Sequence, residues 1–431
     1  MKKSSGVMSA GEGHSPVSST VAVSGYGRIA RVPQEDSDLT RVGLGTPMGE
    51  MMRRYWQPVC LSDELKDLPM KLQIMGEELV AFRDLKGRVG VLDRHCAHRG
   101  TSLEYGRIEE EGLRCCYHGW LFNTSGNCLQ QPGEPPGNHA NDRFRLGAYP
   151  VIEFGGLVFI YMGPPEKEPV FPLYDALEAP GTQVIAYRNY TRGIVADCNW
   201  LQIQENAMDP FHTAVLHSTM GGGLHFSKIF AALPQLGFEE TRMGMKYVRT
   251  SALPNGLTFV RVMEAMVPNA RAMANALVSK EEEHYEKSTT IGWWTPVDDT
   301  HTIGFHLEAM KLVDGKPLPS NKAMAKVGRT SGKVPGRTCY EDTQRDPDDC
   351  EAQVSQRPIA IHKLENLGTT DLGVVMLRRL LRKGLKDIAA GNDPKGIIRD
   401  RSMQSVEIVA GNRIFKDESR HAAVAGALPQ A

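Results

Sequence analysis

The chain has 431 residues, enough for two domains with separate cores. Its 50 basic and 51 acidic residues nearly cancel, which argues against a nucleic-acid partner. No stretch approaches the roughly 20 apolar residues of a membrane-spanning helix. Two lysines near the start have no apolar segment behind them, so we expect neither a secretory signal nor a membrane anchor. Eight cysteines are too few for a disulfide scaffold, which favours reduced thiols and a cytoplasmic location.

The first half of the chain is expected to be a tail followed by a β domain. Residues 1–40 are rich in Ser and Gly and predict a flexible tail. The stretch 46–60 predicts a helix, with Thr46 as N-cap and Pro47 in the first turn. From about 72 to 162, short runs alternate apolar and polar residues between Gly, Asn and Pro. That texture is typical of antiparallel β structure.

The second half is expected to be a larger mixed domain. The Pro- and Glu-rich stretch GPPEKEPVFP, residues 163–172, marks a boundary. Beyond it, strand-like runs mix with helical stretches near 197–218 and 371–390. The predicted fold class is α+β, with one domain over 41–170 and a second over 171–431.

Two short segments in the β domain each offer one thiol and one imidazole. RHCAHRG contains Cys96 and His98, and LRCCYHGW contains Cys115 and His118. A Rieske-type [2Fe-2S] cluster needs that set, because two Cys bind one iron and two His bind the other. Pairing across the segments joins Cys96 with Cys115 and His98 with His118. Neutral His ligands raise the reduction potential compared with four thiolates.

Other interpretations of these cysteines are weaker. A zinc knuckle usually begins with two Cys on one loop, which is not the pattern here. Disulfides of Cys116 with Cys115 or Cys128 are disfavoured by the expected compartment and, for the adjacent pair, by geometry. On an extended segment the side chain of Cys116 points to the side opposite that of Cys115. We therefore expect Cys116 to be a packed thiol and not a ligand. His95, next to Cys96, is excluded as a ligand for the same reason.

A second group of candidate ligands lies in QENAMDPFHTAVLHS, residues 204–218. Two His and one carboxylate on one face of Fe(II) leave the opposite face open for dioxygen and substrate. His212 and His217 are five residues apart, about 140° around a regular helix. They can share a metal only if the helix is broken or bulged, and Pro210 weakens it directly before them. A third ligand is expected from the acidic run at 345–353.

At this point the sequence resembles a known family, the oxygenase components of Rieske non-haem iron oxygenases. The resemblance rests on CAHRG…CCYHGW, with Tyr117, Gly119 and Trp120 in place, and on the motif at 204–218. It extends over about 41–385, with a Rieske domain first and a helix-grip-like catalytic domain second. TRVGLGTPMGEMMRRYWQPV and DPDDCEAQVSQRPIAIHKLENLG are similar to the phthalate-dioxygenase-like branch in particular.

The resemblance also implies roles for individual residues. His212 and His217 fall on the family's mononuclear-iron positions, and alignment of SQRPI selects Asp349 as the third ligand. Asp209 matches the aspartate that links this iron to a Rieske histidine, here His118, of the neighbouring subunit in a trimer. Two further members of the acidic run stay open as alternatives for the third ligand: Asp346 and Asp348. Because a charge run is usually a solvated surface, two of these three aspartates are expected to be exposed to solvent.

The function that this resemblance implies is that of a terminal oxygenase. No flavin or nicotinamide fingerprint is present, so electrons are expected from a separate NAD(P)H-dependent reductase. The expected substrate is an aromatic acid or related ring compound, either cis-dihydroxylated or monooxygenated with O-demethylation. Arg242, Arg249 and Arg261 are candidates to bind its carboxylate. The expected assembly is a homotrimer or a dimer of trimers. The alternatives are a Rieske electron carrier without oxygenase chemistry and a zinc enzyme.

Overall fold

A computed structural model describes residues 32–135, 143–188, 195–218, 228–253, 256–274, 282–313, 316–317 and 339–416. Most of the predicted tail lies outside these residues. Its last part does not, because residues from Glu35 onward belong to one compact unit. Helix α1 (Ser37–Thr40) buries Leu39 and Thr40, so the flexible tail was predicted several residues too long.

The expected helix at 46–60 begins where it was predicted but is much shorter. In α2 (Pro47–Met52), the Thr46 hydroxyl accepts a hydrogen bond from the Gly49 N–H at 3.2 Å. The chain then enters strand β1 (Gln57–Leu61), in which every residue is buried. Pairing with β10 (Leu157–Ile160) therefore overrides the helical pattern over the last part of this stretch.

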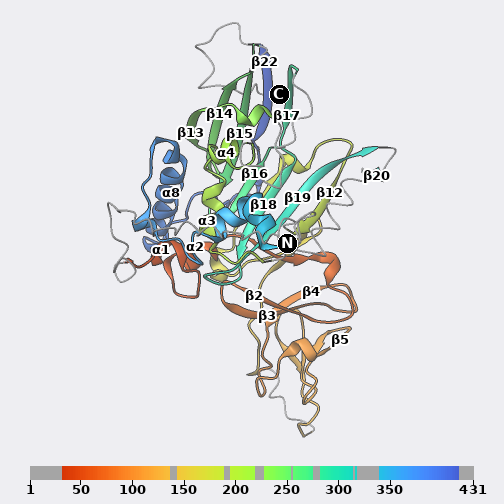
Figure 1. Cartoon of the computed structure of the whole chain (residues 1–431). Coiled ribbons are helices and arrows are strands. Elements are labelled where there is room, and N and C mark those ends of the chain that lie inside the picture. The colour runs from red at the N-terminus through yellow and green to blue at the C-terminus, as the bar shows by residue number, and fades with distance from the viewer. Residues whose placement is uncertain are drawn as a thin grey trace, which may run out of the picture. The chain divides into compact units, whose positions relative to one another are not determined.

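The N-terminal part is antiparallel β structure, as the alternating pattern predicted (Figure 1). One sheet has the order β1-β10-β9 and a second the order β2-β3-β4, and four short strands form a third, β5-β6-β7-β8. The bounds not yet given are β9 (Val151–Phe154), β2 (Met70–Ile74), β3 (Glu77–Arg83), β4 (Val89–Asp93), β5 (Arg107–Glu109), β6 (Gly112–Arg114), β7 (Leu121–Phe122) and β8 (Cys128–Gln130).

The C-terminal part is built on one large antiparallel sheet with the main order β12-β19-β18-β16-β15-β14-β13. β22 pairs with β15 and β17, and β20 extends β19. Elsewhere, β11 and β21 form a parallel pair. The bounds are β11 (Leu173–Tyr174), β12 (Thr182–Arg188), β13 (Gln235–Glu240), β14 (Gly244–Ala252), β15 (Leu257–Met266), β16 (Ala270–Met273), β17 (His284–Lys287), β18 (Thr290–Pro296), β19 (Thr302–Val313), β20 (Lys316–Pro317), β21 (Ser405–Val406) and β22 (Gly411–Lys416).

Helices cover one face of this sheet. Helix α3 (Trp200–Asn206) contacts β18, and α8 (Leu372–Ala389) contacts β14 (Figure 1). The α+β class is thus confirmed, as is the helix expected at 371–390. The stretch 197–218 forms two short helices instead of one, α3 and α4 (His212–Val215). The remaining α-helices of the described residues are α6 (Tyr340–Arg345) and α7 (Asp349–Val354).

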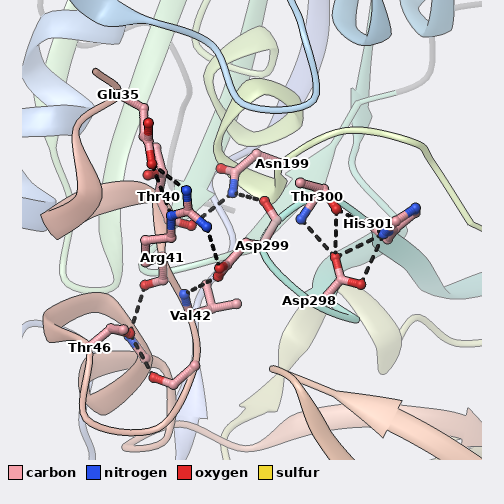
Figure 2. A network of polar contacts seen from close by, with 12 residues as sticks. Glu35, Thr40, Arg41, Val42, Thr46, Asn199, Asp298, Asp299, Thr300 and His301 are labelled. Carbon is pink, nitrogen blue, oxygen red and sulfur yellow. Dashed lines mark hydrogen bonds and ion pairs between the residues drawn. The ribbon is translucent and has the colours of Figure 1, made fainter. Parts of the chain in front are cut away.

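The start of α3 is fixed by a polar network that joins distant parts of the chain (Figure 2). Asn199 caps α3 by accepting from the Leu201 N–H, and its amide donates to the carbonyls of Thr40 and Asp299 at 2.8 and 2.6 Å. The Asp299 carboxylate in turn accepts from Arg41 at 2.9 Å. Helix α1, the β18–β19 turn and the N-terminus of α3 are therefore held in one arrangement.

Candidate metal centres

The two Cys/His segments form matching turns. In the first, the Gly100 N–H donates to the Cys96 carbonyl at 2.8 Å; in the second, the Gly119 N–H donates to the Cys115 carbonyl at 3.1 Å. Both glycines have positive φ, +74° and +75°. A residue with a Cβ is strained in that conformation, so Gly is what allows each turn to close. The two turns present their donors in the same way.

The four donors lie in two pairs. The thiols of Cys96 and Cys115 are both buried and contact each other, and the rings of His98 and His118 lie 4.5 Å apart. Burial, together with the neighbouring Cys115, raises the pKa of the Cys96 thiol to about 11. Trp120 stacks on His98 at 4.7 Å. The buried thiols and the exposed imidazoles thus occupy opposite sides of the group.

This pairing distinguishes between the candidate metals. A tetrahedral zinc, at about 2.0–2.3 Å from each ligand, needs all four donors close together. No three of these donors lie within 4.8 Å of one another, although all four belong to the described residues. Two separate pairs suit two irons, one with Cys ligands and one with His ligands.

Two residues next to the metal donors, Cys116 and His95, lie in different surroundings. Cys116 is exposed, so the packed thiol expected at this position is wrong. Residues 116–118 form a turn, where the alternation of an extended strand does not apply. His95 is held by the Gly100 carbonyl at 2.9 Å and by Glu78 at 3.1 Å, in agreement with its exclusion as a ligand.

The structure brings His212, His217 and Asp349 together. Asp349 Oδ1 lies 3.5 Å from His212 Nε2 and 3.2 Å from His217 Nε2, and one donor atom from each residue lies within 4.8 Å of the others. Asn206 donates to the same oxygen at 3.1 Å. His217 is buried, whereas the other two members are half-buried. Two imidazoles and one carboxylate with one half-open side suit an iron that binds dioxygen.

A break in the helix resolves the 140° separation of the two histidines. The chain turns at Asp209–Pro210 after α3, and α4 then ends at Val215. His217 lies past this end, in a turn, so helical geometry does not set the direction of its side chain. The predicted break between the histidines is therefore confirmed.

Asp209 fixes His212 through its backbone and its side chain. His212 Nδ1 hydrogen-bonds to the Asp209 carbonyl, which can only accept, so Nδ1 carries the proton and Nε2 is left to bind a metal. The Asp209 carboxylate lies 3.7 Å from Nδ1 and accepts from the N–H groups of Phe211 and His212. Burial opposes ionisation, yet these contacts hold the pKa of Asp209 below its usual value.

The acidic run is less exposed than expected. Asp348 is 1% exposed, caps α7 through the Asp349 N–H at 2.8 Å, and lies 3.9 Å from His217 Nδ1. The expectation of a solvated side chain is wrong for Asp348, because a helix begins here inside the protein. Asp346 is half-buried. Asp349 is the member of the run that faces Nε2 of both histidines.

The three arginines proposed as substrate ligands bind protein groups instead. Arg242 lies in a turn, not on a strand, and donates to two backbone carbonyls. Arg249 is completely buried and donates to the Thr213 hydroxyl at 2.5 Å and to two carbonyls. Arg261 donates to an Asn side chain and a carbonyl. Sequence reasoning missed Arg271, which lies near Asp349, because only strand register places it there.

Another acidic group close to this site is neutralised by a guanidinium. The ligand atoms of Glu205, His362 and Glu365 lie within 4.8 Å of one another. Arg378 on α8 donates to both carboxylates at 2.6–2.9 Å. The positive charge of Arg378 thus takes the place of a bound cation. Its hydrogen bonds to Glu205 connect α8 to α3.

Comparison with known proteins agrees with this architecture. A family model described as Rieske [2Fe-2S] domain matches residues 55–150. The tert-butanol monooxygenase / tert-amyl alcohol desaturase oxygenase subunit of Aquincola tertiaricarbonis is 41% identical over 395 residues, covering 88% of this chain and 82% of the relative. Phenoxybenzoate dioxygenase subunit alpha of Ectopseudomonas oleovorans is 40% identical over 386 residues, covering 88% and 91%.

The fold is similar to that of a solved structure, NdmA of Pseudomonas putida CBB5. The TM-score is 0.60 at 20% identity, over 80% of this chain and 94% of that one. Fold and donor sets define an iron-dependent oxidoreductase with a Rieske domain. The chain belongs to the Rieske non-haem iron oxygenases, as an oxygenase subunit that uses a [2Fe-2S] cluster and a mononuclear iron. None of the helices within the described ranges could span a membrane.

Proposed function

We propose that Cys96 and Cys115 hold one iron of the Rieske cluster and that His98 and His118 hold the other. The mononuclear iron is held by His212, His217 and Asp349 in a catalytic domain over 171–431, which follows a Rieske domain over 41–170. The observation that carries this proposal is the approach of Nε2 of both histidines to a single oxygen of Asp349.

The residues around the iron site fix the protonation and the orientation of the ligand side chains. When bound, the iron supplies the site of dioxygen activation, and the cluster supplies an electron. The Asp209 carbonyl holds the proton on Nδ1 of His212, so that Nε2 offers a lone pair. Asn206 orients the Asp349 carboxylate, and Asp348 lies behind His217.

The substrate we propose is an aromatic acid or related ring compound, with electrons from a separate NAD(P)H-dependent reductase in the cytoplasm. The relative named as a phenoxybenzoate dioxygenase subunit supports an aromatic acid. The relative named as a tert-butanol monooxygenase subunit supports a small tertiary alcohol as the second candidate. The outcome is hydroxylation, either of two ring carbons or of one position with O-demethylation.

We further propose a trimer in which Asp209 of one chain hydrogen-bonds His118 of the next. His118 is exposed, and the Asp209 side chain retains 31% exposure beside the iron ligands. A head-to-tail contact of this kind closes into a ring. Each cluster then supplies electrons to the iron of the neighbouring chain.

The test uses purified holoenzyme with a surrogate reductase and NADH. The expected result is about three irons per chain, a Rieske-type EPR signal on reduction, and oxygen uptake that depends on an aromatic acid. Products are analysed for diols and formaldehyde, which separates dihydroxylation from O-demethylation. About two irons per chain and no oxygen uptake would instead favour an electron carrier.

A further inference from the structure

Helix α8 carries a row of cations on its exposed side. Its 18 residues include five basic side chains and one acidic side chain, Asp387. The guanidinium of Arg378 is occupied by Glu205 and Glu365. The other four basic residues are exposed, and their i, i+3, i+4, i+7 spacing places them on one helix face. We call them the α8 basic face: Arg379, Arg382, Lys383 and Lys386.

The apolar side of the same helix is already buried. Val374, Leu377 and Leu381 are only 8%, 0% and 0% exposed, and α8 packs against α2 and α3. A helix that lies on a membrane surface needs its apolar side free to enter the lipid. The α8 basic face therefore offers charge alone, which suits a folded acidic protein better than a membrane.

The charges of this face are poorly balanced within the chain. Arg382 and Lys383 each pair with one carboxylate, yet their side chains keep 47% and 66% exposure. Arg379 and Lys386 form no ion pair with any of the described residues. Like charges three and four residues apart destabilise a helix, and only Lys386 lies in the last turn, where the helix dipole favours a cation. An acidic partner would offset this repulsion.

The beginning of α8 lies next to the proposed contact between subunits. Gly373, in the first turn, packs so closely on the residue before Asp209 that a Cβ there would lie 2.2 Å from the Met208 carbonyl oxygen. With a rise of about 1.5 Å per residue, Arg379 lies about 9 Å and Lys386 about 20 Å farther along the helix axis. A protein bound to this face would thus reach the boundary at which Asp209 is proposed to contact the Rieske domain of the next chain.

We propose that the α8 basic face binds an acidic iron-sulfur domain of the reductase. This inference rests on the proposed function and deepens it by naming where the electron partner binds. One electron passes from the reduced iron-sulfur group of the reductase to the oxidised Rieske cluster of the neighbouring chain, and no bond forms or breaks. Opposite charges mainly raise the rate at which such partners associate, and salt screens this effect.

The experiment follows reduction of the Rieske cluster in oxidised, anaerobic holoenzyme by stopped-flow absorbance. The electron donor is a reduced plant-type [2Fe-2S] ferredoxin with a net negative charge, because its potential lies below that of a Rieske centre. In Arg379→Gln/Lys386→Gln, the second-order rate constant at low salt should fall about tenfold. At about 0.5 M salt the variant and wild type should converge, because the Debye length there is only about 4 Å.

Two further variants and a second electron donor serve as controls. Lys311→Gln/Lys416→Gln removes two exposed cations from β19 and β22, so it changes the net charge equally. It should keep the wild-type rate constant within about twofold. Arg379→Glu/Lys386→Glu, which reverses both charges, should be slower than the corresponding glutamine variant. Photoreduction with a small uncharged deazaflavin should be equally fast in all variants, which shows that their clusters are intact.

Three results would overturn the proposal: an unchanged rate constant in both Arg379/Lys386 variants, an equal fall in the Lys311/Lys416 control, or a wild-type rate constant that does not fall with salt. Binding to phosphatidylserine vesicles that is lost in Arg379→Gln/Lys386→Gln would instead assign this face to a membrane surface. Iron content, the Rieske EPR signal and sedimentation are measured without the ferredoxin, so they report failure of the proposed function or of the trimer separately.

Discussion

The contact between α3 and α8 gives a prediction whose size follows from the structure. Arg378 makes two hydrogen bonds to Glu205, at 2.6 and 2.8 Å, and two to Glu365, at 2.6 and 2.9 Å. Glu205 is only 7% exposed. Removing one partner of a buried ion pair costs about 3–5 kcal/mol, because the remaining charge stays buried. Arg378→Met should lower the free energy of unfolding by that amount at pH 8.

The loss should depend on pH in a defined direction. Burial raises the pKa of Glu205 in the folded protein, although Arg378 opposes this. A carboxyl with a raised folded-state pKa contributes stability at low pH, and this contribution is lost as the pH rises through that pKa. Without Arg378 the pKa of Glu205 rises further. The deficit of Arg378→Met should therefore be larger at pH 8 than at pH 5.5.

Thermal unfolding followed by circular dichroism at both pH values measures the effect. About 3–5 kcal/mol corresponds to a fall of roughly 6–20 °C for a domain of this size. Arg379→Met is the matched control, because this neighbouring arginine is exposed, and its change should stay within about ±0.5 kcal/mol. Adding Glu205→Gln to Arg378→Met should recover part of the loss. A loss equal to that of Arg379→Met, or a larger deficit at pH 5.5, would refute the reasoning.

Three further predictions concern the cluster, the link between the centres and the start of α3. Cys115→Ser should abolish the Rieske EPR signal, whereas Cys116→Ser should keep it, because only the former thiol is buried in the donor group. Asp209→Asn should retain both metal centres but slow single-turnover oxidation of the reduced cluster, as measured by stopped-flow absorbance; a wild-type rate would contradict the proposed bridge. Asn199→Ala should destabilise the protein by about 1–3 kcal/mol in thermal unfolding, since it removes the α3 cap and two hydrogen bonds to carbonyls. No change would exclude this anchoring role.

Features set by local sequence were predictable. The Cys96 and Cys115 segments carry their own turn glycines, so spacing alone indicated the donor pairs. The five-residue spacing of His212 and His217 signalled a break between them, and the end of α4 at Val215 provides it. These signals are local because the chain between the donors is short.

Features set by tertiary contacts were not predictable from pattern. The helix expected from residue 46 ends early, because residues 57–61 pair with a strand about 100 residues later. Asp348 looked solvent-exposed within an acidic run, yet it caps a helix inside the protein. Arg271 carries no motif, and its place beside the iron ligands follows only from strand register.

The central claim is that one chain holds two separate metal centres, with the mononuclear iron on His212, His217 and Asp349. The most direct measurement is iron content together with the EPR spectrum of dithionite-reduced His217→Ala holoenzyme. The account predicts a fall from about three irons per chain to about two, with an unchanged Rieske signal. Retention of about three irons, or loss of the Rieske signal together with the third iron, would contradict it.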